Sequence, residues 1–446
     1  MYLALAIFVI TYVLLLSFGK YRAQIAFGAA LLFILLSFPD MRALFGIDAV
    51  FMPLGSILGA IQWNVILMIF GTMGLVSLFI ESKMPALMAD RIIQKTPNVK
   101  WAVISLAAFA GAISAFVDNV ATVLMVAPIA LTIAKKLKIS PVPSIIAIAV
   151  ASNLEGAATL VGDTTSILLG GYADLTFFDF FFYLGRPSMF WVNQLGLLAA
   201  LLVLFRVFRN DSQPVRMTET TVVTDYVPSV LMVAMVVLLI LASFIPNAPA
   251  LINGYVCAGL MVFGVVRKAF VKKDGKAFLE TLKDIDFFTL LLLASLFVVV
   301  KSIENAGVIT AISNVIFELA GGNTFVIYSV LLWGSVLLSA FIDNIPYVAT
   351  MLPVVTLIAT NVAIQNGLDA AAQHQLVTLL YFGLLSGATL GGNMTPIGAS
   401  ANITGIGILR KEGYEVTTGE FMRIGVPFTL AAVMTAYLLV WFVWSI

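Results

Sequence analysis

Residues 114–128 read Ser-Ala-Phe-Val-Asp-Asn-Val-Ala-Thr-Val-Leu-Met-Val-Ala-Pro, an apolar stretch interrupted by Asp118 and Asn119. The pattern returns from Ser339 to Pro353, where Ser-Ala-Phe-Ile-Asp-Asn-Ile-Pro begins a segment with Asp343 and Asn344 at the matching positions. A carboxylate in the middle of a membrane segment costs roughly 2.5–3.5 kcal/mol on insertion scales, so it indicates a functional site. The same carboxylate at both positions of a repeat strengthens that interpretation.

The composition is that of an integral membrane protein. Of 446 residues, 61% are hydrophobic and 11% charged, too few polar side chains to cover a soluble globule. The net charge of +1 and the lack of a basic run give no indication of nucleic acid. Phosphate loops, nucleophile elbows and zinc-spaced Cys/His sets are absent, so we expect neither an enzyme nor a cofactor. Met1 to Ser17 lacks the features of a signal peptide and is interpreted as a retained first span.

Apolar stretches long enough to cross a bilayer recur along the chain. The candidate spans are 2–17, 25–38, 62–80, 143–173, 190–209, 228–245, 251–266, 286–302, 375–409 and 424–444. Two further apolar stretches, 101–134 and 325–362, surround the two Asp-Asn pairs.

The distribution of lysine and arginine predicts how these two stretches insert. The loops 83–100 and 135–141 are both basic although they flank the same Asp118 stretch, so both should be cytoplasmic. Residues 101–134 are then a re-entrant hairpin of two half-length helices with Asp118 and Asn119 at its tip. The loop 363–374 has no Lys or Arg, so hairpin 325–362 should enter from outside. Lys20 and Arg22 are expected inside, and both termini extracytoplasmic, in a bacterial inner membrane.

The prediction is therefore an all-α polytopic membrane protein made of two inverted-topology repeats. Each repeat has about five transmembrane helices, one hairpin and one broken helix. The N-terminal repeat spans 1–209, with hairpin 101–134 and broken helix 143–173. A cytoplasmic linker covers 210–227, and the C-terminal repeat spans 228–446, with hairpin 325–362 and broken helix 375–409. The alignment sets Ala158-Thr159-Leu160-Val161-Gly162-Asp163-Thr164-Thr165 on Ala388-Thr389-Leu390-Gly391-Gly392-Asn393-Met394-Thr395.

These Gly-, Thr- and Asp-rich stretches cannot stay helical at little cost, because glycine loses about 1 kcal/mol against alanine. Unwound backbone is tolerated in a bilayer only where it lines a cavity or is buried in protein. We expect both breaks to face the hairpin tips and bind a small ion. The candidate ligands are Asp118, Asn119, Thr122, Thr159, Gly162, Asp163, Thr164, Asp343, Asn344, Thr389, Gly392, Asn393, Thr395, Ser400 and Asn402. Within this set, Asn119, Asp163, Asn344 and Asn393 are the candidate Na⁺ ligands.

These groups are hard oxygen and amide ligands, suited to Na⁺, protons or a small oxyanion. The alternative is that Gly, Thr, Asp and Asn serve only close helix packing and interhelical hydrogen bonds. Packing does not require the same carboxylate at both tips. The packing-only alternative remains open for the individual Thr and Ser residues.

Three segments resemble the Ion Transporter superfamily: Ile285-Asp286-Phe287-Phe288-Thr289-Leu290, the Ser-Ala-Phe-Ile-Asp-Asn-Ile-Pro hairpin, and the stretch Gly391 to Asn402. The resemblance is to the branch of arsenite pump membrane subunits, NhaD-type sodium/proton antiporters and the melanosomal P protein. It implies an elevator-type transport domain moving against a dimeric scaffold, with Gly162-Asp163 and Gly392-Asn393 as ion-coordinating breaks. The chain departs from that branch at 162–166, where Gly-Asp-Thr-Thr-Ser replaces Gly-Asp-Pro-Pro-Asn, and this leaves the substrate open.

The leading hypothesis is a secondary active transporter driven by a Na⁺ or H⁺ gradient, with Na⁺/H⁺ antiport favoured by the carboxylate-rich site. The alternative is a cation-coupled carrier of arsenite, another small oxyanion or a carboxylate. A third hypothesis is an ion channel, and single-channel currents would identify it. The expected partners are the lipid bilayer, a small ion or anion, and a second copy in a homodimer.

Overall fold

The computed structural model describes residues 1–46, 50–215, 220–272 and 277–445, and these are almost entirely helical. Eight described helices are long and apolar enough to cross a membrane, or up to ten if each of two bent pairs forms one span. The described strands form one two-residue antiparallel pair, β1 (Phe182–Tyr183) and β2 (Arg186–Pro187). The all-α membrane fold predicted from the sequence is confirmed.

The same order of elements occurs twice: a hairpin of two helices, a broken helix and a long helix. In the first half these are α7 (Val99–Ser114), α8 (Asn119–Leu137), α9 (Val142–Glu155), α10 (Thr164–Tyr172) and α11 (Met189–Val207), preceded by α5 (Trp63–Glu81) and α6 (Met84–Gln94). In the second half they are α17 (Thr324–Ser339), α18 (Asn344–Asn366), α19 (Ala370–Gly391), α20 (Ser400–Lys411) and α21 (Thr418–Trp444). The latter are preceded by α12 (Val227–Ala242), α13 (Ile252–Lys272), α14 (Ala277–Asp284), α15 (Phe287–Asn305) and α16 (Val308–Leu319).

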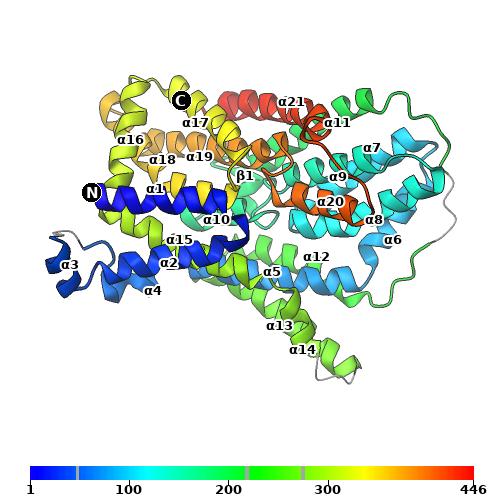
Figure 1. Cartoon of the computed structure of the whole chain (residues 1–446), viewed down its shortest axis with the longest axis horizontal. Coiled ribbons are helices and arrows are strands. Elements are labelled where there is room, and N and C mark those ends of the chain that lie inside the picture. The colour runs from blue at the N-terminus through cyan, green and yellow to red at the C-terminus, as the bar shows by residue number, and fades with distance from the viewer. Residues whose placement is uncertain (47–49, 216–219, 273–276, 446) are drawn as a thin grey trace.

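The helices form two layers (Figure 1). One layer contains α5, α12, α13, α14 and α15, and the other contains the hairpins, the broken helices, α11 and α21. Within the first layer α5 packs closely along α13, because Gly71 lies directly against the backbone of Cys257 and Ala258. A side chain at Gly71 would overlap that backbone, so glycine permits this close approach.

Asparagine and aspartate begin all four hairpin helices. The Asn98 side chain accepts from Trp101 N at the start of α7, and Asn323 accepts from Val326 N at the start of α17. Asp118 and Asp343 occupy the same capping position in α8 and α18. Such side chains satisfy amide groups that have no partner in the first turn of a helix. The hairpin boundaries therefore follow from local sequence.

The expectation of half-length hairpin helices is wrong for α8 and α18, which are long and apolar enough to cross a membrane. The four helices have 16, 19, 16 and 23 residues, which corresponds to about 24–35 Å at 1.5 Å per residue. That is most or all of a hydrocarbon core about 30 Å thick. The charged loops that predicted the hairpins indicate on which side each begins but not how deep it reaches.

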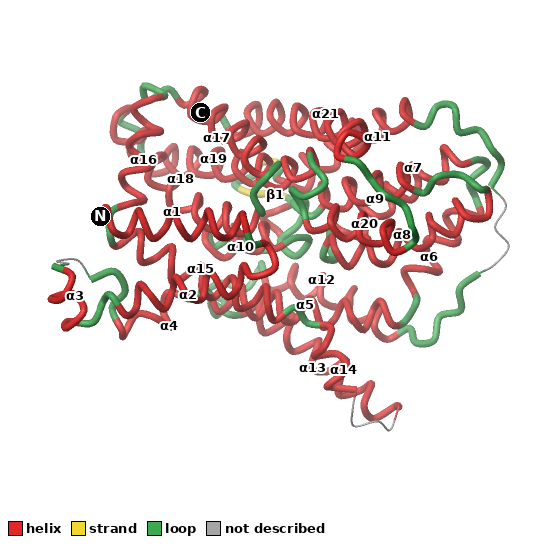
Figure 2. The backbone as a smooth tube through the Cα atoms, viewed as in Figure 1, coloured by secondary structure: helices red, strands yellow, loops and turns green. Residues whose placement is uncertain are grey.

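The two hairpins occupy opposite halves of the molecule, α7–α8 on the right of Figure 1 and α17–α18 on the left, with their tips near the centre. The tube view in Figure 2 shows loop segments gathered in the same central region, near α10 and β1. This placement supports the inverted repeat, which remains a prediction together with the orientation of the termini. Residues 216–219 of the predicted linker 210–227 lie outside the described residues.

The first two predicted spans, 2–17 and 25–38, form helices that are joined by a sharp bend. Helices α1 (Tyr2–Ser17) and α2 (Arg22–Leu35) meet at an angle of 115° around a short 3₁₀ turn, Gly19–Tyr21, and the bend lies near the centre of the molecule (Figure 1). Lys20 and Arg22 are expected on the cytoplasmic side, and this sidedness remains a prediction. The Arg22 side chain pairs with Asp343 at a hairpin tip, a contact that the sequence does not indicate. Two short helices, α3 (Pro39–Phe45) and α4 (Ile57–Ala60), follow before α5.

Candidate functional site

Asp118 and Asp343 both cap a helix at a hairpin tip, but only Asp343 forms an ion pair among the described residues. Asp118 Oδ1 accepts hydrogen bonds from Val120 N at 3.0 Å and Ala121 N at 3.2 Å, and Asp343 Oδ1 accepts from Ile345 N at 3.0 Å. These amides and the helix dipole stabilise a negative charge at each tip. Asp343 also pairs with the Arg22 guanidinium. Among the described residues Asp118 has no such cationic partner.

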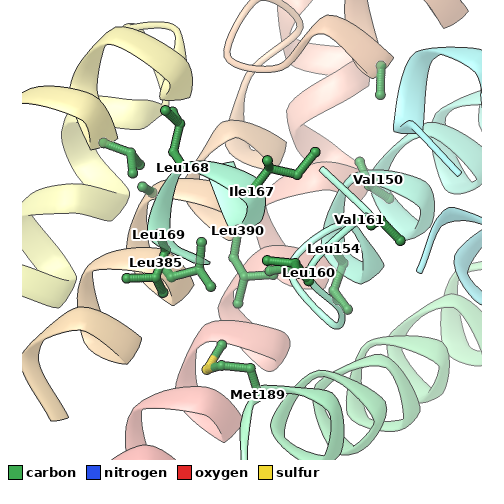
Figure 3. Close-up of a cluster of buried hydrophobic side chains, with 14 of the residues drawn as sticks. Val150, Leu154, Leu160, Val161, Ile167, Leu168, Leu169, Met189, Leu385 and Leu390 are labelled. Atoms are coloured by element: carbon green, nitrogen blue, oxygen red, sulfur yellow. The ribbon is translucent and has the colours of Figure 1, made fainter. Parts of the chain in front are cut away.

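The first broken helix is unwound between the end of α9 at Glu155 and the start of α10 at Thr164. Asp163 caps α10, because its Oδ1 accepts from Thr164 N at 2.8 Å and its Oδ2 from Thr165 Oγ1 at 3.0 Å. A buried apolar cluster surrounds this break and holds it against α19 (Figure 3). Its members include Val150, Leu154, Leu160, Val161, Ile167, Leu168, Leu169, Met189, Leu385 and Leu390. The unwound backbone is therefore enclosed by protein, as a bilayer requires.

Each hairpin tip docks on the broken helix of its own half through the same contacts. Thr159 Oγ1 donates to Ala115 O in the first half, and Thr395 Oγ1 donates to Ala340 O in the second. Gly162 lies against the carbonyl oxygens of Ser114 and Ala115, as Gly398 does against Ser339 and Ala340.

These contacts correct the alignment of the two breaks by six residues. Gly156, Thr159 and Gly162 are the structural counterparts of Gly392, Thr395 and Gly398. The counterpart of Asp163 is therefore Ala399, which precedes α20 as Asp163 precedes α10, and not Asn393. The pairing of Gly162-Asp163 with Gly392-Asn393 is wrong, because the repeated Ala-Thr-Leu letters at 158 and 388 fall at different points of the two helices.

A cavity of about 850 Å³ lies between the two layers, where both tips and both breaks meet. Seven predicted site residues line it: Asp118, Asn119, Asp163, Thr164, Asp343, Asn344 and Ser400. The other eight, Thr122, Thr159, Gly162, Thr389, Gly392, Asn393, Thr395 and Asn402, are absent from the lining. Hydrogen bonds to backbone occupy Thr122 and the Asn402 amide nitrogen, which donate to Asp118 O and to Gly392 O and Thr395 O. The structure therefore favours a role for Thr122 and Asn402 in holding the backbone of the site, and not in binding the ion directly.

The predicted Na⁺ ligands are only partly brought together. Asn119, Asp163 and Asn344 line the cavity, whereas Asn393 lies behind it, accepting from Asn153 Nδ2 at 3.1 Å and donating to Val150 O at 2.9 Å. No group of three or more His, Cys, Asp and Glu side chains suited to a metal occurs in the described parts of the chain. Amide, hydroxyl and backbone oxygens would therefore have to complete the shell of a bound Na⁺.

Asn153 is a cavity residue that the sequence prediction missed. Its Oδ1 accepts from Asn119 Nδ2 at 2.9 Å, and its Nδ2 donates to Thr389 O at 2.8 Å and to Asn393 Oδ1. The fully buried Asn153 therefore joins the first tip to the broken helix of the other half. An Asn inside an apolar helix was the available signal.

Replacing Asn153 by Ala should lower the free energy of unfolding by about 1–3 kcal/mol, because Asn119 and Asn393 lose buried hydrogen-bond partners. Thermal unfolding of the purified protein in detergent measures this loss. Gln24, an exposed amide of α2 outside the cavity lining, provides the control as Gln24→Ala. An equal loss in both variants would contradict a bridging role for Asn153.

Two further charged residues at the site were not predicted. Asp286 lines the cavity and caps α15, accepting from Thr289 N at 3.1 Å and Thr289 Oγ1 at 2.6 Å. It belongs to the family-like segment at 285–290, which was the available signal. Arg22 had none, because its partner Asp343 is 321 residues away in the sequence.

The charges near α14 are partly neutralised by ion pairs. Lys268 Nζ lies 2.6 Å from Glu81 Oε2 and 3.5 Å from Glu280 Oε2, and Ser77 Oγ donates to Asp284 Oδ2 at 2.5 Å. The lining carboxylates are Glu81, Asp118, Asp163, Glu280, Asp284, Asp286 and Asp343, against the lysines Lys268 and Lys283. The cavity is therefore strongly acidic.

Several curated proteins similar to this chain are named as transporters. An uncharacterized transporter of Mycobacterium tuberculosis is 30% identical over 449 residues, covering 98% of this chain and 97% of the relative. An uncharacterized transporter of Synechocystis is 27% identical over 383 residues, covering 83% of this chain and 84% of the relative. The human P protein is 26% identical over 461 residues, covering 85% of this chain and 54% of that protein. The resemblance to the P protein branch is confirmed.

Two solved transporters share the fold. The YdaH transporter of Alcanivorax borkumensis aligns with a TM-score of 0.55 at 14% identity, over 96% of this chain and 98% of that one. MtrF of Neisseria gonorrhoeae, presented as illuminating a class of antimetabolite efflux pumps, aligns with a TM-score of 0.55 at 14% identity, over 92% and 86%. At this identity the likeness concerns the fold alone.

The family comparison covers most of the chain. The citrate transporter family CitMHS matches residues 12–373, a range that contains both hairpins and the first broken helix. The fold and the paired tips agree with this match, and the chain belongs to the CitMHS family of membrane transporters.

Proposed function

We propose that this transporter is a secondary active carrier that exchanges Na⁺ for H⁺ at the cavity between the two tips. The observation that carries the proposal is the acidic cavity, which places Asp118, Asp163 and Asp343 in one lining with few basic side chains. Carboxylates in a low-dielectric site are stable when paired with a cation or neutralised by a proton. A site with more carboxylates than cations therefore favours the uptake of Na⁺ or H⁺.

Competition between Na⁺ and H⁺ follows most directly at Asp118. This carboxylate accepts from two backbone amides and forms no ion pair with a cationic side chain in the described structure. Either a Na⁺ or a proton can neutralise its single negative charge. Binding of one ion therefore weakens binding of the other. If the site binds Na⁺ when it faces one side of the membrane and H⁺ when it faces the other, the carrier exchanges Na⁺ for H⁺ without using a nucleotide.

The two layers support elevator-type alternating access as the mechanism. The cavity is lined on one side by Met73 and Val76 of α5 and Thr289 of α15, and on the other by the tips and breaks. Movement of the tip-and-break layer along the other layer would carry a bound ion across. The resemblance to elevator transporters adds a homodimer, in which the α5–α13 layer would form the static scaffold.

Proteoliposomes with an imposed pH gradient test the proposal. Addition of Na⁺ without any transported anion should collapse the gradient, as followed by a pH-sensitive dye inside the vesicles. Asp118→Asn should abolish the collapse, while Asp211→Asn, a change in the described part of the linker, should not affect it. If the gradient collapses only when an anion is supplied, Na⁺/H⁺ antiport is the wrong function.

A cation-coupled carrier of a small carboxylate or oxyanion is the second candidate. It is favoured by the family's description as citrate transporters and by the guanidinium of Arg22 beside the cavity. Citrate added to the same vesicles would separate the two candidates. Citrate uptake driven by Na⁺ or H⁺ would support this candidate against simple antiport.

A further inference from the structure

Among the described contacts, those from side chains of the N-terminal helices α1 and α2 to the hairpin tips all go to the second tip. Arg22, the first residue of α2, pairs through its guanidinium with Asp343, and the two side chains are 23% and 13% exposed. Tyr12 of α1 donates its hydroxyl proton to Pro346 O at 2.6 Å and lies against Thr350 Oγ1. Both contacts are made to the first two turns of α18. We call Tyr12 and Arg22 together the N-terminal clasp.

The clasp makes the two tips chemically different. No arginine or tyrosine side chain makes a corresponding contact with the first tip in the described part of the chain. Asp118 has backbone amides as hydrogen-bond donors, whereas Asp343 has an amide and a permanently charged guanidinium. Arginine does not lose its proton in proteins, so it cannot leave Asp343 by deprotonation.

We propose that Arg22 is a tethered counter-ion that occupies Asp343 and must be displaced before a transported cation binds there. This inference rests on the proposed function, since it concerns which ion occupies the same site. In the observed state the guanidinium takes the position next to Asp343 Oδ2 that an incoming Na⁺ would need. Arg22 is thus a positioning residue that sets how readily the second tip accepts a cation.

The clasp also joins the two layers. Helix α2 packs along α15 in one layer, and Asp343 lies at the tip of a hairpin in the other. Any displacement of the tip relative to α2 would separate the guanidinium from the carboxylate. A bound cation and the Arg22 guanidinium therefore exclude each other at Asp343. Cation binding favours release of the clasp, and release of the clasp favours cation binding.

The expected size of the effect follows from the fraction of time that Asp343 is unoccupied. If Arg22 blocks Asp343 about 90% of the time, the apparent dissociation constant for the competing cation is raised about tenfold. Removing the guanidinium should lower the half-saturating Na⁺ concentration by about that factor. It should not lower it if the pair serves only to hold the helices together.

The test compares Arg22→Gln, Arg22→Lys and Tyr12→Phe with the unchanged protein in Na⁺-driven exchange. Arg22→Gln should lower the half-saturating Na⁺ concentration about tenfold, and Arg22→Lys should give an intermediate value because lysine keeps the charge without the planar fork. Tyr12→Phe removes the hydrogen bond to Pro346 O but leaves the Arg22–Asp343 ion pair in place, so it should shift that concentration much less than Arg22→Gln does. Lys20→Gln, which removes an exposed charge two residues away, is the matched control.

The outcomes separate this inference from the proposed function. If the unchanged protein exchanges Na⁺ and Arg22→Gln has the same half-saturating concentration, Arg22 does not compete with the cation. A matching shift in Tyr12→Phe would likewise overturn the inference, because it would indicate a purely structural clasp. If neither the unchanged protein nor any variant exchanges Na⁺, the proposed function itself is wrong. Should Arg22→Gln fail to fold, the Arg22→Lys and Tyr12→Phe pair decides the matter by the same criterion.

Discussion

Replacing Asp343 by Asn should abolish cation exchange while the chain remains folded. The amide keeps the shape of the side chain and an oxygen that can still accept from Ile345 N, so α18 keeps its cap. What is lost is the negative charge, which alone can balance Na⁺, a proton or the Arg22 guanidinium. Exchange in proteoliposomes measures the first effect, and size-exclusion chromatography of the purified protein measures the second.

Asp369→Asn is the matched control for this variant. Asp369 also caps a helix, accepting from Ala372 N at 2.8 Å at the start of α19, but it is exposed and away from the cavity. Its replacement should leave exchange unchanged. The double variant Arg22→Gln/Asp343→Asn removes the cation left unpaired by the single change and should still be inactive. Undiminished exchange in Asp343→Asn would remove this carboxylate from the site.

Replacing Gly398 by Ala should cause a large loss of stability by forcing the second tip away from its broken helix. A Cβ at this position would lie 2.6 Å from Gly392 O and 2.9 Å from the carbonyl oxygens of Ser339 and Ala340. All three neighbours are backbone, so the tip and the break would have to move apart. Overpacking of this kind costs about 1–3 kcal/mol, and rigid neighbours favour the upper end.

Thermal unfolding in detergent, followed by intrinsic tryptophan fluorescence, measures the change. Gly407→Ala in α20 is the control, because nothing lies within 4 Å of a Cβ there. Alanine is favoured over glycine inside a helix by about 1 kcal/mol, so the control should be unchanged or slightly stabilised. Equal unfolding temperatures for Gly398→Ala and the unchanged chain would show that the tip does not rest on the break.

The sequence predicts much of this fold because its strongest signals are local. The apolar spans are visible by length alone, and the repeated Ser-Ala-Phe-x-Asp-Asn pattern marks both tips as helix caps in an apolar setting. The spacing Gly-x-x-Thr-x-x-Gly at 156–162 and 392–398 was also present in the sequence. A longer match of letters, Ala-Thr-Leu at 158 and 388, favours a different register and obscures this spacing.

The remaining features depend on contacts that no local pattern contains. In the sequence, Arg22 is indistinguishable from a charged loop residue. In the structure, the bend at Gly19–Tyr21 places it next to Asp343. Asn153 becomes a bridge only because α9 crosses the broken helix of the other half, where Thr389 and Asn393 accept its hydrogen bonds. Pairings between such distant segments arise from tertiary packing, which a single sequence does not encode in any short window.

The tight seam between α5 and α13 has a practical consequence for experiments on motion. Cys257, the only thiol in the chain, has no exposed surface, and its backbone lies against Gly71. A maleimide reagent should therefore leave the native chain unlabelled. Pairs of cysteines introduced on the two layers could then carry spectroscopic probes without first removing the native residue, and the distance between the probes would report directly on sliding.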